Sequence, residues 1–204
     1  MGRWLLVLIV MAAALSACDE SESSLPRLEF SQFGDPTDSP YCLPYPVGQT
    51  WTLNNSYSTE GSHRGRFAYD FFMPVGSEVT AARNGKVTET RGQYRDDDPA
   101  GGHENGVFVL HEDGTMAAYL HFTEAGVHVE VGDEVVTGEV LGLVGTSGTS
   151  PTNPHLHFEV WEQQNPQWYQ SLPGNFRNAV GPLDLSNGLV TDAAYEAVDC
   201  PPAP

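Results

Sequence analysis

Short runs of strand-forming residues recur through the middle of the chain, and in the last of them apolar and polar side chains alternate. A period of two is typical of strands, and Gly, Asn and Asp separate one run from the next. No stretch within 48–165 repeats its apolar residues at the 3.6-residue spacing of an amphipathic helix. The runs are Phe67–Phe72, Glu78–Ala82, Gly85–Thr90, Gly106–His111, Thr115–His121, Glu134–Val136, Glu139–Val144 and His155–Glu162. The pattern predicts an all-β fold, a compact antiparallel sandwich or barrel with irregular N- and C-terminal extensions.

The two flanks of this region differ from it in composition. Residues 18–47 are rich in Ser, Asp and Pro, which indicates a tether, and residues 166–204 are rich in Pro, Asn and Asp. We expect one domain over 48–165, with 166–204 packed on it as an extension. Within the domain, Asn84-Gly85 and Asp113-Gly114 each lie between strand-like runs, which predicts two tight hairpins.

The N-terminus has the features of an export signal. Arg3 precedes an apolar run, Trp4–Leu15, that is too short for a comfortable transmembrane helix. The run leads into Leu15-Ser16-Ala17-Cys18, which resembles the lipobox of bacterial lipoproteins; a plain signal peptide with an accidental cysteine is the alternative. The lipobox implies a signal over residues 1–17 and a lipidated Cys18 that anchors the mature chain to a membrane.

Two cysteines remain when Cys18 is set aside, Cys42 and Cys200. In an exported protein an even pair predicts a disulfide. This bond would tie the segment before the domain to the tail after it. Two free thiols are the alternative.

The charge balance argues against binding to nucleic acid and against electrostatic adhesion to anionic lipid. The chain has 27 acidic and 9 basic residues, and its formal net charge is -18. Nucleic-acid binding needs Lys and Arg to contact phosphates, and adhesion to anionic lipid needs them as well. We therefore expect no nucleic-acid partner and interpret the acidic surface as solubilising.

His155-Leu156-His157 opens the last strand-like run. Alternate side chains of a strand share a face, so the two imidazoles lie on one face, about 7 Å apart, and Leu156 lies on the other. Imidazole is the commonest metal-ligating side chain. The pair therefore indicates half a metal site, or one ligand beside a catalytic base; a merely polar strand face is the alternative.

Asp70 stands out because it interrupts the apolar run Phe67–Met73. A carboxylate in such a run is expected to be buried, and therefore either paired with a cation such as Arg83 or bound to a metal. Two further histidines, His63 and His121, lie near strand-like runs. The others lie beside acids in turn-like or strand-end positions and are expected to be exposed: His103, His111 and His128.

The order of these residues resembles that of the lysostaphin-like and LytM-like zinc endopeptidases, which cut peptide bonds in bacterial cell walls. Asp70–Gly76 is similar to the family's Asp-Phe-x-x-Pro-x-Gly strand. Val131–Val135 and Gly145–Gly148 are similar to the glycine-punctuated segment before its His-x-His strand. The resemblance covers roughly residues 60–162 and implies an antiparallel β-sandwich or barrel of the LytM type, a duplicated hybrid motif.

The resemblance also implies a site with one zinc ion per chain. Its ligands would be His63, Asp70 and His157, and two imidazoles with one carboxylate suit zinc and leave one position open for water. The general base and the oxyanion-stabilising group would be His121 and His155, in an order that the sequence does not decide.

Two residues near this set need separate treatment. Glu159 either orients a histidine as a hydrogen-bond acceptor or is exposed. His63 departs from the family's spacing, because the family has His-x-x-x-Asp whereas six residues separate His63 from Asp70. A turn at 64–66 would let His63 reach the same metal.

The implied function is that of an exported zinc metalloendopeptidase acting on peptidoglycan stem peptides or crosslinks, in the cell envelope. The membrane, through the acylated N-terminus, and cell-division or wall-synthesis proteins would be its further partners. Asp19 resembles an inner-membrane retention signal on the periplasmic side.

Three alternatives belong to other classes. One is a non-catalytic LytM-like regulator that activates cell-wall amidases. Another is a lipoyl or biotin carrier, but Lys86, the only lysine, lacks the carrier motif. The third is a sugar-phosphotransferase barrel, whose cytoplasmic location conflicts with an export signal.

Overall fold

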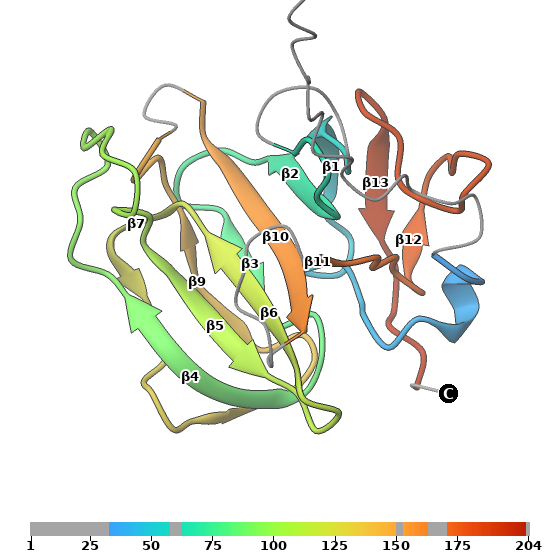
Figure 1. Ribbon diagram of the computed structural model, residues 1–204, viewed down its shortest axis with the longest axis horizontal. Helices are drawn as coiled ribbons and strands as arrows, with labels where there is room; N and C mark the ends of the chain where they lie inside the picture. Colours follow the sequence, from blue (N-terminus) through green and yellow to red (C-terminus); the bar gives the residue numbers. More distant parts are fainter. Residues whose placement is uncertain (1–32, 58–62, 150–152, 163–170, 203–204) are drawn as a thin grey trace, which may run out of the picture.

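Two antiparallel sheets make up the computed structural model, which describes residues 33–57, 63–149, 153–162 and 171–202 (Figure 1). The larger sheet has ten strands in the order β12-β13-β1-β2-β10-β6-β5-β4-β8, with β11 beside β10, and the smaller has the order β3-β9-β7. The elements are η1 (Pro36–Asp38, a 3-10 turn), β1 (Thr50–Asn55), β2 (Ala68–Phe72), β3 (Glu78–Thr80), β4 (Gly85–Arg91), β5 (Gly106–Leu110), β6 (Thr115–Leu120), β7 (Phe122–Val127), β8 (Glu134–Val135), β9 (Val140–Val144), β10 (His155–Glu162), β11 (Ser171–Leu172), β12 (Ala179–Val180) and β13 (Ala194–Ala197). The predicted all-β fold is confirmed.

The sequence patterns predict β2–β6 and β8–β10 to within two residues at each end. They do not predict β1, β7 or the three C-terminal strands. Among these, β11 and β12 have only two residues each, too few to show a period. The C-terminal segment is thus less irregular than expected: β13 pairs with β1 and extends the larger sheet. The limit between domain and extension at residue 165 stays a prediction, since residues 163–170 lie outside the described part.

One of the two predicted hairpins is confirmed. At Asp113-Gly114, which joins β5 to β6, Gly114 has a φ of 83° and the Asp113 carboxylate accepts from the Thr115 amide at 3.0 Å. The hairpin at Asn84-Gly85 is wrong, because β3 and β4 belong to different sheets. Gly85 is needed there for another reason: a Cβ at this position would collide with the Leu110 carbonyl of the neighbouring strand.

The core lies between the sheets and is rich in aromatic side chains. Leu156, Phe158 and Val160 face it from β10, and each is at most 2% exposed. Phe158 packs edge-to-face on Tyr119 of β6, with ring centroids 5.3 Å apart. Burying such a side chain contributes roughly 1.5 to 3 kcal/mol. This packing holds β10 rigidly in the centre of the larger sheet, with its histidines on the opposite face.

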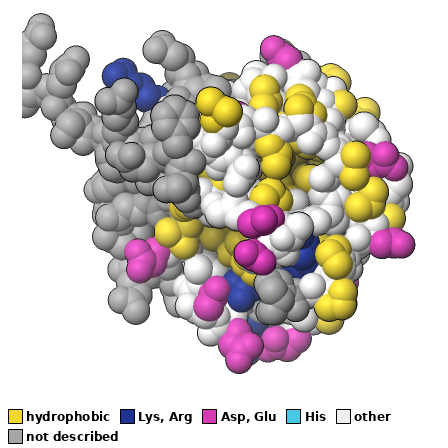
Figure 2. All heavy atoms as spheres, turned by 90° about the vertical axis from the view of Figure 1, so that its right-hand side faces the viewer, with side chains coloured by type: hydrophobic (Ala, Val, Ile, Leu, Met, Phe, Trp, Pro, Cys, Tyr) yellow, Lys and Arg dark blue, Asp and Glu magenta, His cyan; other side chains and the backbone are white. Residues whose placement is uncertain are grey.

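The segments at the two ends of the described chain meet beside this sheet. Cys42 and Cys200 form a disulfide, with Cα atoms 6.1 Å apart. The Leu43 amide donates to the side chain of Asn178 at 2.7 Å, which ties the same two segments together. Figure 2 shows the face on the side of the C-terminal strands, where apolar and acidic side chains are spread over the visible surface. None of the helical structure in the described part is long and apolar enough to cross a membrane.

Candidate metal centre and active site

Asp70 and His157 meet because two strands pair in register. On β2 and β10 these two residues are direct cross-strand partners, so their side chains project from the same face. His157 Nδ1 lies 2.8 Å from Asp70 Oδ1. Burial raises the pKa of the Asp70 carboxyl, but the hydrogen bond from His157 and the closeness of His63 outweigh it and hold that pKa well below its usual value.

His63 joins this pair from a turn before β2. Its carbonyl accepts from the Arg66 amide at 2.9 Å, and Gly65 has a φ of 72°, a conformation that favours glycine. The turn takes up the extra residues between His63 and Asp70. As a result His63 Nε2 lies 3.1 Å from Asp70 Oδ2.

The protonation of His63 follows from its other nitrogen. Nδ1 lies 2.9 Å from the carbonyl oxygen of Ser56, which can only accept, so Nδ1 carries the proton and Nε2 keeps a lone pair. Despite its closeness to Asp70, this buried Nε2 has no hydrogen bond of acceptable geometry in the described part. An unsatisfied buried acceptor is costly, roughly 1 to 3 kcal/mol.

A metal ion would satisfy this atom. One ligand atom from each of His63, Asp70 and His157 lies within 4.8 Å of the other two, and all three residues are buried. Two nitrogens and one carboxylate oxygen are a donor set that zinc accepts in a tetrahedral site with one open position. The residues therefore fit the zinc ion that the sequence predicts.

His155 and His121 lie together beside the three candidate ligands, with ring centroids 4.5 Å apart. His155 Nε2 is 3.7 Å from Asp70 Oδ1. In both residues Nδ1 lies 2.8 Å from a backbone carbonyl oxygen, of Asn153 and of Ser147, so Nδ1 carries the proton and Nε2 the lone pair.

Both of these imidazoles are held neutral. Burial lowers the pKa of His155. Burial, followed by the charges of His155 and His157, lowers the pKa of His121 to about 3. His121 also has a φ of 67°, a left-handed conformation that is uncommon outside glycine and is often found at functional sites.

Glu159 is completely buried, two residues beyond His157 on the same strand face. It forms an ion pair with Arg66, whose Nε donates to Glu159 Oε1 at 3.0 Å, and its other oxygen lies 3.4 Å from His157 Nε2. Burial raises the pKa of Glu159, but the hydrogen bonds from His157 and Arg66 lower it to about 2. The sequence left two possibilities for Glu159, exposure or acceptance of a hydrogen bond from a histidine. Glu159 is buried and lies beside His157.

Arg66 is the site residue that the sequence analysis did not single out. It lies in the turn that separates His63 from Asp70, 93 positions from its partner. One signal could have found it: a glutamate beside two histidines on a central strand needs a cation when buried, and the inserted turn contains two arginines.

The histidines open into a cleft of about 990 Å³. Asp70, His121, His155 and His157 line its floor, and its walls carry both aromatic and charged side chains. The wall residues include Asn55, Arg66, Glu89, Arg91, Tyr94, Glu104, Phe108 and Trp161. A cleft of this size is typical of a ligand site and can take an extended peptide.

The remaining predicted residues lie elsewhere. His103 pairs with Asp98 at 2.7 Å and stacks on Tyr94. His111 was expected to be exposed, and this is wrong: it is 3% exposed, at the end of β5 against Tyr41. Cys18 lies outside the described residues.

With the site's geometry established, comparison with known proteins decides the family. The sequence profile of peptidase family M23 matches residues 63–168, just over half of the chain. The chain belongs to peptidase family M23. The match begins at His63 and contains every candidate ligand and both further histidines.

Two relatives are endopeptidases. The chain is 37% identical over 117 residues to the glycyl-glycine endopeptidase ALE-1 of Staphylococcus capitis, which covers 57% of this chain and 26% of that protein. It is 33% identical over 122 residues to the peptidoglycan DD-endopeptidase ShyA of Vibrio cholerae, again 57% of this chain and 26% of the relative. The chain therefore spans about a quarter of the length of these curated relatives.

Two further similarities complete the comparison. The crystallised catalytic domain of lysostaphin from Staphylococcus simulans is 26% identical, over 60% of this chain and 86% of that one, with a TM-score of 0.45. The murein hydrolase activator NlpD of Salmonella typhimurium is 28% identical over 108 residues, 53% of this chain and 25% of NlpD. M23 relatives thus include both endopeptidases and an activator.

Proposed function

We propose that this chain is a zinc-dependent metalloendopeptidase that hydrolyses peptide bonds in peptidoglycan, in stem peptides or in crosslinks. The observation that carries the proposal is the buried cluster of His63, Asp70 and His157, in which a nitrogen of His63 has no hydrogen bond to any described residue. Membership of family M23 and the endopeptidases among its relatives support the reaction class.

Each ligand has one atom suited to the metal. His63 would bind through Nε2, because its Nδ1 proton is donated to Ser56. His157 would bind through Nδ1, because Nε2 faces Glu159. Asp70 would bind through its carboxylate. When bound, zinc polarises the scissile carbonyl and makes water a stronger nucleophile.

His155 and His121 would move the proton. Each is neutral with a lone pair on Nε2, so each can accept the proton of the attacking water there. The histidine that is protonated can then donate to the developing oxyanion or to the leaving amine. His155, which is nearer to Asp70, and His121, across from it, therefore act as a pair on the cleft side of the metal ligands.

The ion pair of Arg66 and Glu159 would position His157. Glu159 accepts from His157 Nε2, which keeps the other nitrogen toward Asp70, and Arg66 fixes the glutamate. Hydrogen-bond partners of this kind orient metal-ligating histidines. This assigns Glu159 a supporting part and no direct contact with the substrate.

We place this activity in the cell envelope, with the chain anchored through a lipidated Cys18. The support is the resemblance of Leu15–Cys18 to a lipobox and of Asp19 to an inner-membrane retention signal. Several acyl chains give stable membrane binding where one does not. Intact-mass measurement of the mature protein tests this: a diacylated N-terminal Cys18 is expected, and an unmodified N-terminus well past residue 18 would contradict it.

Digestion of purified wall sacculi tests the activity itself. The protein with one zinc per chain should release soluble muropeptides, treatment with a chelator should stop the release, and added zinc should restore it. The likeness to NlpD supports a second candidate, an activator of cell-wall amidases. If the protein binds no zinc and releases material only when an amidase is present, the activator proposal replaces the enzyme.

A further inference from the structure

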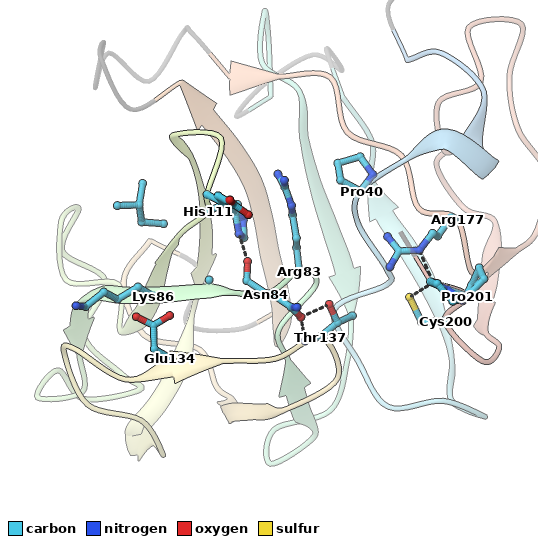
Figure 3. A pocket seen from close by; sticks show the side chains of 14 residues that line it. Pro40, Arg83, Asn84, Lys86, His111, Glu134, Thr137, Arg177, Cys200 and Pro201 are labelled. Carbon is cyan, nitrogen blue, oxygen red and sulfur yellow. Dashed lines mark hydrogen bonds between the residues drawn. The ribbon is translucent and has the colours of Figure 1, made fainter. Parts of the chain in front are cut away.

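A second cavity, of about 680 Å³, lies at the end of β4 and β5 that is remote from the metal-centre histidines. Figure 3 shows the side chains that line it. Lys86 and Leu110 are cross-strand partners at this end, whereas Gly106, at the other end of β5, pairs with Leu120 next to His121. Its volume is in the range of small-molecule sites. None of its lining residues is a candidate ligand or catalytic residue.

Five of the fourteen residues that line this cavity come from outside the part of the chain that matches the family. Pro40 precedes residues 63–168, and Arg177 and 200–202 follow them. The disulfide of Cys42 and Cys200 joins these two segments, and the Cys42 amide donates to the Ala82 carbonyl at 2.8 Å. The segments before and after the matched part therefore form one side of the cavity and are fixed against the end of β4 by these bonds.

The cavity concentrates positive charge on an acidic protein. The chain has a net charge of -18, yet three basic side chains line this one cavity: Arg83, Lys86 and Arg177. They are three of the seven in the described part, the others being Arg64, Arg66, Arg91 and Arg95. Two acids, Glu112 and Glu134, also line it, so the basic groups exceed the acidic ones by one.

The two arginines are held in place by groups that leave further donors available. Arg83 donates through one terminal nitrogen to Asp113 at 2.6 Å and lies over the ring of Tyr41. Arg177 donates to the carbonyls of Pro201 and Ser39, at 2.8 and 3.0 Å. A guanidinium has five N–H donors, so each keeps some for a ligand. Burial and, after it, the charge of Arg83 lower the pKa of Arg177.

His111 gives a second, independent observation. It lines the cavity, and its Nδ1 lies 2.9 Å from the Asn84 carbonyl, so Nδ1 carries the proton (Figure 3). Its buried Nε2 has no hydrogen-bond partner in the described part of the chain. The fixed cations in the wall favour a ligand that carries an anionic group.

We propose that this cavity binds a small oxyanionic ligand, a carboxylate or a phosphate, between Arg83 and Arg177 with Lys86 as a third charge. Guanidinium groups match the geometry of both oxyanions. An N-acylated amino acid and hydrogen phosphate each have a donor next to the charge. The site would act independently of the metal centre, so occupation of one does not require the other.

Calorimetric titration of the full chain with N-acetylalanine and, separately, with inorganic phosphate tests the proposal. At least one probe should bind saturably, and the probe that binds identifies the ligand class. Loss of a charge-assisted hydrogen bond in Arg83→Gln should weaken binding by at least about tenfold. Lys86→Gln, which removes a side chain with no hydrogen bond or ion pair to a described residue, should weaken it several-fold without changing the fold.

The control is Arg95→Gln, an exposed arginine paired with Asp97 outside this cavity. It should bind as the wild type does, and the zinc content of all three variants should be unchanged. Thermal unfolding shows whether Arg83→Gln remains folded. The proposal is overturned if neither probe binds, or if Arg83→Gln and Lys86→Gln bind the probe as tightly as Arg95→Gln does.

Discussion

The metal centre has a half that strands hold and a half that loops hold. Asp70 and His157 are cross-strand partners on β2 and β10, so the pairing of the larger sheet fixes their distance. His63 lies in a turn and His121 follows the end of β6, and each depends on one backbone carbonyl and a left-handed residue for its orientation. Strand register therefore sets the geometry of the strand-held half, whereas local contacts set the geometry of the loop-held half.

The largest effect is expected in the strand-held half. Asp70→Ala and His157→Ala each remove one of three ligands, which is the usual minimum for a catalytic zinc site. Bound zinc should fall to background, and wall hydrolysis should fall by well over ~100-fold, because the chemistry that the metal supplies is lost. Metal analysis of the purified variants and a sacculus-digestion assay measure both. If either variant kept one zinc per chain, the cross-strand pair of Asp70 and His157 would not be part of the metal site.

The two histidines assigned to proton transfer, His121 after β6 and His155 at the start of β10, should behave differently. His121→Ala and His155→Ala leave the three ligands in place, so zinc should stay at one per chain. Loss of proton transfer or charge stabilisation should lower the rate by ~100-fold or more. If zinc is lost together with activity, the assignment of these histidines to proton transfer is wrong and they are ligands.

The Arg66–Glu159 ion pair connects the two halves, because Arg66 belongs to the turn after His63 and Glu159 to β10. Glu159→Gln keeps the shape of the side chain but removes its charge. Zinc affinity should fall by ~10- to 100-fold, as is typical for groups that orient a ligand. Arg95→Gln is the matched control, since its exposed pair with Asp97 is worth at most about 1 kcal/mol. Competition with a metal-binding dye gives the zinc affinity of each variant. Equal affinities would show that Glu159 does not orient His157.

The smallest expected effect comes from two glycine substitutions, one in the turn beside His63 and one remote from the metal centre. Gly65→Ala and Gly114→Ala place a Cβ at left-handed positions with φ values of 72° and 83°. Both should lower the free energy of unfolding by about 1 kcal/mol. Only Gly65→Ala should weaken zinc binding, by several-fold, because its turn positions His63. Denaturant titration and the dye assay separate the two quantities, and equal zinc affinities would mean that the turn does not matter for the site.

The same division explains what the sequence could predict. The apolar run Phe67–Phe72 and the alternation in His155–Glu162 predict both strands, and the His-x-His spacing predicts two imidazoles on one face. The pairing of Asp70 with His157 could not be predicted from this alternation, because register depends on residues 87 positions apart; only the family resemblance supplied it.

The loop-held half of the metal centre was harder to predict than the strand-held half. The six-residue spacing between His63 and Asp70 departs from the family pattern, and only the fold shows that the turn at Gly65 brings the two within 3.1 Å. The contact of Arg66 with Glu159 is a long-range pairing that no local pattern encodes. The C-terminal strands escaped prediction because two to four residues carry almost no periodicity.

The most direct test of this account is the zinc content of His63→Ala beside that of the wild type and of His128→Ala, a histidine outside the cluster. His63 is the candidate ligand with the unusual spacing, and its buried Nε2 has no hydrogen-bond partner among residues 33–57, 63–149, 153–162 and 171–202. The account predicts one zinc per chain in the wild type and in His128→Ala, and loss of zinc and of wall hydrolysis in His63→Ala. Full zinc and full hydrolysis in His63→Ala would contradict it.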